Sequence, residues 1–313
     1  MILVSGKTGG ILMRVAVILV NYGQWELTRK CIDSLDRSSS VDIRITLIDN
    51  CSPGSVPSWA CSRSGLRFKR MEENTGFAGG NNAGFKMSLD DDAEYTFFLN
   101  NDAEVLPETI LNLTKHLNDN ARTGIVAPAV YWKSDPEKLW GAGGNLVRWK
   151  MRFEQVDLTG MGSSLDKGLK VDFVSGCALM IRTDLFSMIG GFREDFFMYY
   201  EDADLCRKVI EQGYSIEVLP FETVLHNVAS GSGGELSRIA LYFSERNRIV
   251  LSRDMLSPSM RFVFMVYKSA VLMVLTLKFL LWQGPERIPW IWRGYFDGLA
   301  GRTGYSEVID KLI

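Results

Sequence analysis

Short apolar runs alternate with stretches of helical spacing along the first hundred residues of the chain. Residues 14–20 are almost continuously apolar, as expected for a strand buried on both faces of a sheet. Residues 25–35 follow, with Leu27, Cys31 and Leu35 at helical spacing. The same alternation predicts further strands at 43–48, 66–71 and 95–99 and a short helix at about 83–89. This alternation of strands and helices predicts an α/β fold with a mainly parallel central sheet covered on both faces.

The last of these strands ends abruptly in two amides and a carboxylate, Asn100, Asn101 and Asp102. In open α/β sheets, ligands bind beyond the carboxyl ends of the strands. Because a hard divalent cation prefers oxygen ligands, Asp102 can hold Mg²⁺ or Mn²⁺ against a diphosphate. The alternative is a polar turn that caps a helix beginning near Pro107.

Polar residues also follow the first two strands, at Asn21 and Tyr22 and at Asp49 and Asn50. Since the ends of parallel strands meet at one edge, these residues predict a nucleotide site. Asp49 can accept hydrogen bonds from a base or a ribose. The alternative for Asp49 and Asn50 is an Asx turn before Pro53.

Residues 74–82 form a glycine-rich stretch that is expected to be a loop. Gly76, Gly79 and Gly80 permit a close approach of the backbone to a ligand and positive φ angles. The alternative is a loop without any binding role.

A second acidic cluster, Glu201, Asp202 and Asp204, follows the aromatic run 196–200 and opens a predicted helix that ends before Gly213. The helix dipole favours carboxylates at this position, so capping alone explains them. However, the apolar run can also desolvate one carboxylate and allow it to act as a general base.

The chain has two histidines. His116 lies on the helix expected at 107–117 and is expected at the surface. His226 ends an apolar run and precedes the glycine-rich residues 231–234. A hydrogen-bonded structural role is the default for His226, but a metal-ligand role competes with it because a carboxylate site is expected nearby.

Composition is that of a globular protein from a reducing compartment. Five cysteines, an odd number without a CxxC pair, argue against a disulfide framework or a zinc site. Residues 1–12 show no signal-peptide pattern, and Met13 is a candidate natural start because residues 14–22 already form a complete strand. The formal net charge is −2, but from Leu236 onward 11 basic residues face 6 acidic ones. A basic, apolar tail on an acidic body suggests contact with anionic lipid.

The tail contains a strongly apolar stretch at 261–282, about long enough to cross a bilayer. Arg261, Lys268 and Lys278 lie near one side of a helical wheel, which favours a helix in the membrane interface over a spanning one. Trp282, Trp290 and Trp292 are then expected at the level of the headgroups, with Arg287 and Arg293 nearby, so that 261–293 would contact the membrane. The alternative is a helix packed on its own domain or on a dimer partner.

In this order, the motifs resemble those of family 2 glycosyltransferases with the GT-A fold, and most closely the rhamnosyltransferase-like enzymes of surface-polysaccharide assembly. The matching stretches are 20–22, 48–50, 74–82, 99–102, 190–192 and 196–204, and His226 with Gly231 and Ser232. The resemblance implies a Rossmann-like catalytic domain at 13–235, with a nucleotide-binding half at 13–102 and an acceptor half at 103–235. Residues 1–12 would be a leader, and 236–313 a helical, membrane-associating segment.

The resemblance also implies roles for single residues. Asp102 and His226 would hold Mg²⁺ or Mn²⁺, and Asp202 would be the base, with Glu201 as the second candidate. The residues expected around the nucleotide are Val20, Asn21, Tyr22, Asp49, Asn74, Gly76, Phe77, Gly80, Asn81, Asn100 and Asn101. Asn100, Asn101 and Asp102 stand where the family has a two-aspartate metal motif, so one carboxylate remains for the metal.

The expected function is an inverting, metal-dependent transfer of a sugar from a nucleotide-diphosphate donor to a glycan or polyprenyl-linked acceptor. The resemblance favours deoxythymidine-diphosphate rhamnose as the donor. The enzyme is expected in the cytoplasm, peripheral or monotopic at the inner face of the cell membrane, without a nucleic-acid partner; a homodimer stays open. The alternatives are a non-catalytic scaffold that binds nucleotide sugars and a nucleotidyltransferase, for which residues 21–25 supply no basic side chain.

Overall fold

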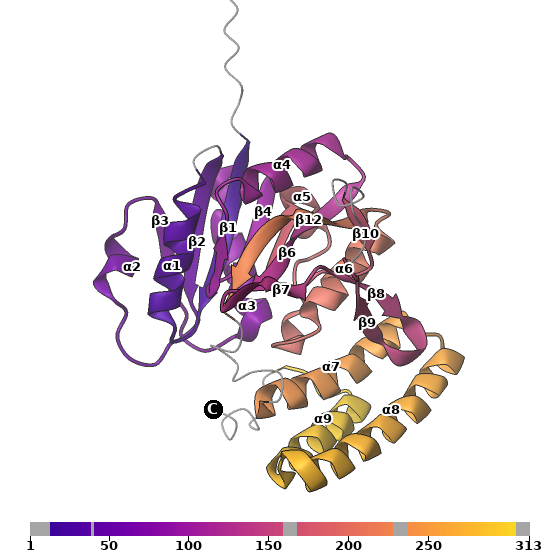
Figure 1. Cartoon of the computed structure of the whole chain (residues 1–313). Coiled ribbons are helices and arrows are strands. Elements are labelled where there is room, and N and C mark those ends of the chain that lie inside the picture. Colours follow the sequence, from indigo (N-terminus) through magenta and orange to yellow (C-terminus); the bar gives the residue numbers. More distant parts are fainter. Residues whose placement is uncertain (1–12, 39–40, 159–167, 228–236, 305–313) are drawn as a thin grey trace, which may run out of the picture.

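The computed structural model contains a curved sheet with helices on both faces and a separate layer of C-terminal helices beneath it (Figure 1). It describes residues 13–38, 41–158, 168–227 and 237–304. The expected leader at 1–12 and the expected boundary at 235 therefore lie outside the described residues. The strands of the main sheet are β1 (Arg14–Asn21), β2 (Asp42–Asp49), β3 (Leu66–Arg70), β4 (Tyr95–Asn100), β5 (Ala103–Val105), β6 (Thr123–Trp132), β7 (Asp135–Gly141), β10 (Leu169–Val171), β11 (Ala178–Arg182) and β12 (Ser215–His226).

The sheet is mixed. The neighbours β4-β1-β2-β3 are parallel, as the sequence predicts, and so is the pair β6-β12, whereas the other strand pairs are antiparallel. The order is β10-β12-β6-β11-β4-β1-β2-β3, with β5 added to β12 and β7 to β6. β11 was not expected there: it runs antiparallel between β4 and β6. This insertion places the start of β11 beside the end of β4, where the polar residues 100–102 begin. A separate two-stranded sheet consists of β8 (Gly144–Val147) and β9 (Arg152–Gln155).

Helices cover both faces of the sheet. Successive side chains of a strand point to opposite sides, and because the central strands are apolar throughout, both sides need to be buried. Val17 of β1 belongs to the core under α1 (Trp25–Leu35), α2 (Ser58–Ser62) and α4 (Thr109–Asp119). Its neighbour Ile18 belongs to the core under α3 (Gly76–Ser88), α5 (Thr183–Met188) and α6 (Glu201–Glu211). The predicted two-sided architecture is confirmed.

The glycine-rich stretch 74–82 is mostly helix, and the prediction of a loop was wrong. Helix α3 begins at Gly76, whose φ is +71°. A Cβ atom on Gly76 would lie 2.2 Å from the backbone oxygen of Phe197. The glycine therefore allows another segment to approach the first turn of a helix, a use that composition alone does not distinguish from a loop.

His116 is not the surface residue that the sequence analysis expected. Its side chain is 18% exposed, and Nε2 lies 2.9 Å from Oε2 of Glu217 on β12. The same carboxylate accepts hydrogen bonds from the hydroxyls of Thr123 and Ser215. His116 thus takes part in a polar cluster between α4 and the sheet, away from the strand ends that carry the expected site.

The C-terminal layer consists of α7 (Arg238–Met255), α8 (Pro258–Lys278) with a π turn at Phe279–Gln283, and α9 (Ile288–Ala300). Gly294 and Gly298 of α9 bring α9 close to α7, since a Cβ atom on Gly294 would lie 2.4 Å from Tyr242 O. Lys268 of α8 is fully buried, and its Nζ lies 2.5 Å from Oε2 of Glu245 on α7. The expectation that Lys268 faces a membrane interface was therefore wrong.

Candidate active site

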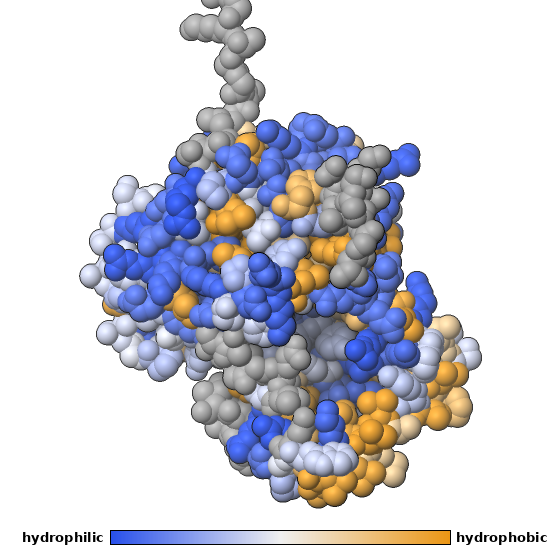
Figure 2. Space-filling view, in the orientation of Figure 1, coloured by the Kyte–Doolittle hydropathy of each residue, from blue (hydrophilic) through white to orange (hydrophobic). Residues whose placement is uncertain are grey.

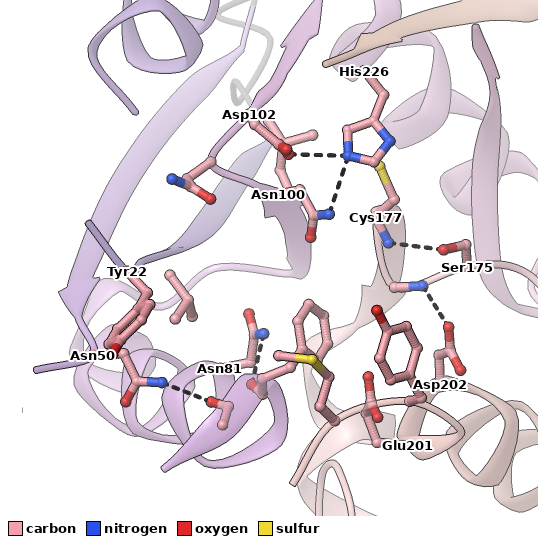
Figure 3. Close-up of a pocket in the computed structure, with 18 of the residues that line it drawn as sticks. Tyr22, Asn50, Asn81, Asn100, Asp102, Ser175, Cys177, Glu201, Asp202 and His226 are labelled. Atoms are coloured by element: carbon pink, nitrogen blue, oxygen red, sulfur yellow. Dashed lines mark hydrogen bonds and ion pairs between the residues drawn. The ribbon is translucent and has the colours of Figure 1, made fainter. Parts of the chain in front are cut away.

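A cavity of about 550 Å³ lies beyond the carboxyl ends of β1, β4 and β12 (Figure 3). Residues from distant parts of the sequence meet in it, as the parallel strands require. Twelve of the fifteen residues expected in the site line this cavity: Val20, Tyr22, Asn74, Gly76, Phe77, Asn81, Asn100, Asn101, Asp102, Glu201, Asp202 and His226.

Asp102 and His226 meet because β5 pairs with the end of β12. The register places His226 opposite Ala103, and the backbone N–H of Asn227 donates to Asp102 O at 2.9 Å. As a result, Nε2 of the imidazole lies 3.0 Å from Oδ1 of Asp102. The two residues expected to hold a cation are thus in direct contact, although they are 124 positions apart in the sequence.

The Asp102–His226 pair is nearly enclosed by protein. Trp140 packs its ring edge-on against the imidazole, with ring centres 5.0 Å apart. Burial disfavours the imidazolium, but the neighbouring Cys177 thiol and Asp102 carboxylate outweigh this effect and raise the pKa of His226 to about 10.

The side chains of Asp102 and His226 fit a divalent cation. One carboxylate and one imidazole suit Mn²⁺ or Mg²⁺ when phosphate and water complete the coordination. Within the described residues, no group of three or more His, Cys, Asp or Glu side chains could hold a metal. The ring of His226 is held by Asp102 and Asn100 at Nε2 and by the Trp140 ring packed against it.

Glu201 and Asp202 lie on another side of the cavity, at the first turn of α6 (Figure 3). Oδ2 of Asp202 accepts the N–H of Gly176 at 3.1 Å, and Oδ1 accepts the N–H of Ala203 at 2.8 Å. Burial raises the pKa of Asp202 to about 6, while burial and the charge of Asp202 raise the pKa of Glu201 well above its usual value. The pKa values of both carboxyls are thus shifted upward, toward the range in which a carboxylate works as a general base.

Residues 175–177 connect the two sides of the cavity, and the sequence analysis did not single them out. Asn100 N–H donates to Cys177 O at 2.8 Å, next to the Asp102–His226 pair. One residue earlier, Gly176 N–H holds Asp202. A Cβ atom on Gly176 would lie 2.9 Å from the Phe77 ring, so this position has little room for a side chain. In the sequence, the only signal for these positions is that three small residues interrupt the apolar run 171–181.

Asn50 shapes the remaining wall of the cavity. Its Nδ2 donates to Asn74 Oδ1 and to Gly76 O, both at 2.9 Å, and its Oδ1 accepts the N–H of Thr75 at 3.0 Å. These bonds fix the turn before α3, where Asn81 Nδ2 also donates to Phe77 O at 2.9 Å. Together with Tyr22, the turn forms a polar and aromatic surface opposite the acids (Figure 3).

Three expected site residues do not line the cavity. Asp49 is fully buried; its Oδ1 accepts the N–H of Ser52 at 3.1 Å, and its Oδ2 lies 3.5 Å from Arg70 Nε. Asn21 is also fully buried, and its Oδ1 accepts hydrogen bonds from the side chains of both Thr28 and Asn101. A Cβ atom on Gly80 would lie 2.8 Å from Cγ1 of Val20. Direct nucleotide contacts by these residues stay a prediction.

Ala240 and Ser244 of α7 also line the cavity, and they escaped the sequence analysis because nothing in the sequence around them marks a site. Trp140 of β7, which the sequence offers as a pocket contact near the acceptor, lines the cavity as well. The aromatic side chain of Trp140 is a typical sugar-facing surface, but its place beside His226 follows from strand pairing that the sequence does not specify.

Comparisons with known proteins identify the family of the chain. The model for glycosyl transferase family 2 matches residues 16–187, and a model described as the N-terminal domain of galactosyltransferase matches 159–228. The chain is 27% identical to the low-salt glycan biosynthesis hexosyltransferase Agl10 of Haloferax volcanii, over 94% of this chain and 93% of that one. Over 63 residues, 20% of each chain, it is 38% identical to the N-acetylglucosaminyl-diphospho-decaprenol L-rhamnosyltransferase of Mycobacterium tuberculosis.

Among solved structures, the fold is similar to that of the mannosyltransferase PcManGT from Pyrobaculum calidifontis in complex with GDP-Man and Mn²⁺. The TM-score is 0.58 at 16% identity, over 93% of this chain and 87% of that one. The predicted GT-A fold with a C-terminal apolar helix is confirmed, and so is the prediction of a glycosyltransferase. Because the family 2 match covers more than half of the 313 residues, this protein belongs to glycosyl transferase family 2.

Proposed function

We propose that this glycosyltransferase inverts the configuration of the transferred sugar and depends on Mg²⁺ or Mn²⁺. One observation carries the proposal: the Asp102–His226 pair and the Glu201–Asp202 pair face a single cavity from different sides (Figure 3). A cation ligand set and a poised carboxylate in one cavity are the two elements that a one-step displacement needs.

Asp202 takes the proton from the acceptor hydroxyl, which then attacks the anomeric carbon from the face opposite the diphosphate. Gly176 N–H and Ala203 N–H hold the carboxylate in place. Asp102 and His226 hold the cation, which when bound neutralises the charge that develops on the departing diphosphate. Because Asn50 lines the cavity and Asp49 does not, Asn50 contacts the nucleotide in this proposal.

The donor is a nucleotide-diphosphate hexose or deoxyhexose, with rhamnose favoured. Support comes from the names of two relatives, a hexosyltransferase of glycan biosynthesis and an L-rhamnosyltransferase. The acceptor is a glycan or a polyprenyl-linked sugar in surface-polysaccharide assembly, since the mycobacterial relative is named for a diphospho-decaprenol acceptor. Trp140, beside His226, is placed to contact a sugar ring.

Thermal-shift screening of nucleotide sugars with and without Mn²⁺ tests the donor class. At about 100 times its dissociation constant, the correct nucleotide sugar with Mn²⁺ should raise the Tm by about 4 °C. The increase should be much smaller in EDTA, because phosphate then meets the Asp102 carboxylate without a cation between them. A nucleoside triphosphate that stabilises better than every diphosphate sugar would contradict the proposal and favour nucleotidyl transfer.

The proposal also places α8 and α9 on the cytoplasmic surface of the cell membrane. Apolar side chains gather over these helices in the space-filling view (Figure 2). The more than half-exposed ones are Phe262, Val266, Met273, Val274, Leu277, Leu280, Leu281, Trp282 and Phe296. Soluble surfaces rarely expose so continuous an apolar patch without a partner.

The geometry of α8 favours a helix that lies on the membrane over one that crosses it. Pro258–Trp282 is long and apolar enough to span, with a mean hydropathy of 1.8 and 22% of the window buried. However, Phe264, Lys268 and Leu272 are fully buried and occupy the inner side of α8. One side is thus used for packing and the other is left for lipid, which is the arrangement of an interfacial helix.

Charged substitutions on the outer side of α8 test membrane attachment. Met273→Glu combined with Leu277→Glu should lower co-flotation with anionic liposomes at least about tenfold, because two apolar side chains lose burial in lipid. Met188→Glu on α5 is the matched control, since Met188 is 61% exposed but lies outside the patch. Equal flotation of both variants and the native protein would contradict attachment through α8.

A further inference from the structure

The segment 196–200, which leads into the acids Glu201 and Asp202, has an unusual backbone. Three of its residues have positive φ: Phe197 at 64°, Tyr199 at 66° and Tyr200 at 72°. L-residues with bulky side chains rarely adopt such angles, and a segment that does so persists only where its surroundings hold it. The position of Asp202 therefore depends on whatever holds this segment.

Helix α3 holds one part of the segment. Phe197 O accepts the N–H of Phe77 at 2.8 Å and that of Ala78 at 3.4 Å. The absence of a side chain at Gly76 makes this approach possible. Since Phe77 lines the cavity, this contact connects the segment to the nucleotide side of the site.

Asn247 of α7 holds the rest of the segment. Its side chain is fully buried, and Nδ2 lies 2.9 Å from Phe196 O and 2.8 Å from both Met198 O and Tyr199 O, so its two N–H groups donate to three carbonyls with one hydrogen shared. One amide group thus binds three carbonyls within four consecutive residues. The last of these carbonyls lies two positions before Glu201.

Arg246 fixes the orientation of this amide. Arg246 Nε donates to Asn247 Oδ1 at 2.8 Å, so the amide nitrogen points toward the carbonyls. Arg246 Nη2 donates to Phe196 O at 2.9 Å, and Nη1 donates to Gly304 O at 2.7 Å. The guanidinium is fully buried and lies 4.7 Å from the centre of the Phe243 ring. Because the guanidinium is fixed, a flipped amide would turn its nitrogen toward the N–H of Arg246 and lose this hydrogen bond.

We propose that Asn247, oriented by Arg246, is a positioning residue for the catalytic acids: it holds the segment 196–200 so that Asp202 meets the acceptor hydroxyl. Neither side chain lines the cavity, so their influence passes through the backbone. The inference rests on the proposed role of Asp202 as the base. Helix α7 already links the sheet to the apolar helices, since Glu245 of α7 pairs with Lys268 of α8. The proposal gives α7 a second function, in the position of the catalytic residues.

Asn247→Ala tests this role by removing all three donations without adding a charge. Because misplacement by about 1 Å can cost about 100-fold in rate, kcat should fall by about 10–100-fold. The KM for the donor should change by less than about threefold, since α3 still holds Phe197 O. Asn112→Ala on α4 is the matched control: it removes an amide donation to Glu222 outside the cavity and should leave kcat and KM unchanged.

A crystal structure of Asn247→Ala supplies a readout that does not need activity. We expect Tyr199 and Tyr200 to leave the left-handed region and Asp202 to lose its contact with Gly176. If the native protein transferred no sugar, the proposed function would fail while this structural result would still decide the inference.

Arg246→Lys is the second variant, because lysine keeps the charge but loses the Nε that orients the amide. Like Asn247→Ala, Arg246→Lys should lower kcat and leave the KM for the donor unchanged. An unchanged kcat in Asn247→Ala, an equal loss of kcat and donor affinity, or an unchanged backbone at 196–200 would overturn the proposal. So would failure of both variants to fold, because the pair would then serve the fold as a whole.

Discussion

Asp202→Asn should lower kcat by about 10²–10⁴-fold, the usual contribution of a general base. The amide keeps the shape of the carboxylate, and its oxygen can still accept the N–H of Gly176, but it cannot take a proton. Binding of the nucleotide sugar with Mn²⁺, measured by calorimetry, should stay close to native because Asp202 faces the acceptor side. Release of the nucleoside diphosphate measures the rate.

Glu201→Gln is the comparison that separates the two acids. Burial and the neighbouring charge raise the pKa of Glu201 well above its usual value, so its ionised form is disfavoured and neutral glutamine is a conservative replacement. We expect a loss of less than about tenfold, since the proposed base, Asp202, is kept. A larger loss for Glu201→Gln than for Asp202→Asn would exchange the roles of the two residues.

The pH dependence of the native enzyme follows from the same carboxylate. A base works only when ionised, and the pKa of Asp202 is raised by burial to about 6, so kcat should rise with pH through about 6 and then level off. The folded-state pKa lies above the ordinary value of 3.8, so ionisation opposes folding and stability falls as pH rises through this window. Asp202→Asn should therefore melt no lower than the native protein at pH 8, which distinguishes lost chemistry from lost structure.

The sequence predicts the nucleotide-binding half of the fold well, because its strands are buried on both faces and carry continuous apolar runs. β1, β2 and β4 begin and end within about two residues of the expected positions. The run 171–181 indicates a strand pair or a bend, but the antiparallel position of β11 between β4 and β6 was not predicted, since it depends on long-range pairing. The helical start at Gly76 was missed because glycine is a poor helix former, and only the approach of Phe197 explains its presence.

Site residues could be predicted where a polar motif follows an apolar run. They could not be predicted where the direction of a side chain decides whether it lines the cavity. Asp102 and Asp202 lie where polar residues follow an apolar run, and both line the cavity. Asp49 and Asn50 are neighbours in sequence, but only Asn50 lines the cavity, a choice that depends on the bulge-like turn at Cys51, whose φ is 62°. The family resemblance continues only weakly through residues 246–248, and the role of Asn247 depends on carbonyl groups 48 to 51 positions away in the sequence.

The orientation of α8 also could not be predicted from the sequence, although a helical wheel was available. The apolar character of α8 is legible in the sequence, but Arg261, Lys268 and Lys278 do not form one polar face. Lys268 pairs with Glu245 in the interior, while Lys278 is exposed. A helical wheel places charges around an axis, but the direction that faces the protein is set by the acidic residue on α7.

Asp102→Ala should weaken Mn²⁺-dependent binding of the nucleotide sugar by at least about 100-fold, because a cation held by two protein ligands loses its only carboxylate. His226 alone offers one nitrogen ligand and no negative charge to balance that of the cation. Calorimetric titration at several Mn²⁺ concentrations measures the loss. Glu104→Ala is the matched control, since Glu104 lies two residues further along the chain and pairs with Lys133 instead. A titration of Asp102→Ala that superimposes on the native one would remove Asp102 from the cation site, and with it the chemical reason for its contact with His226.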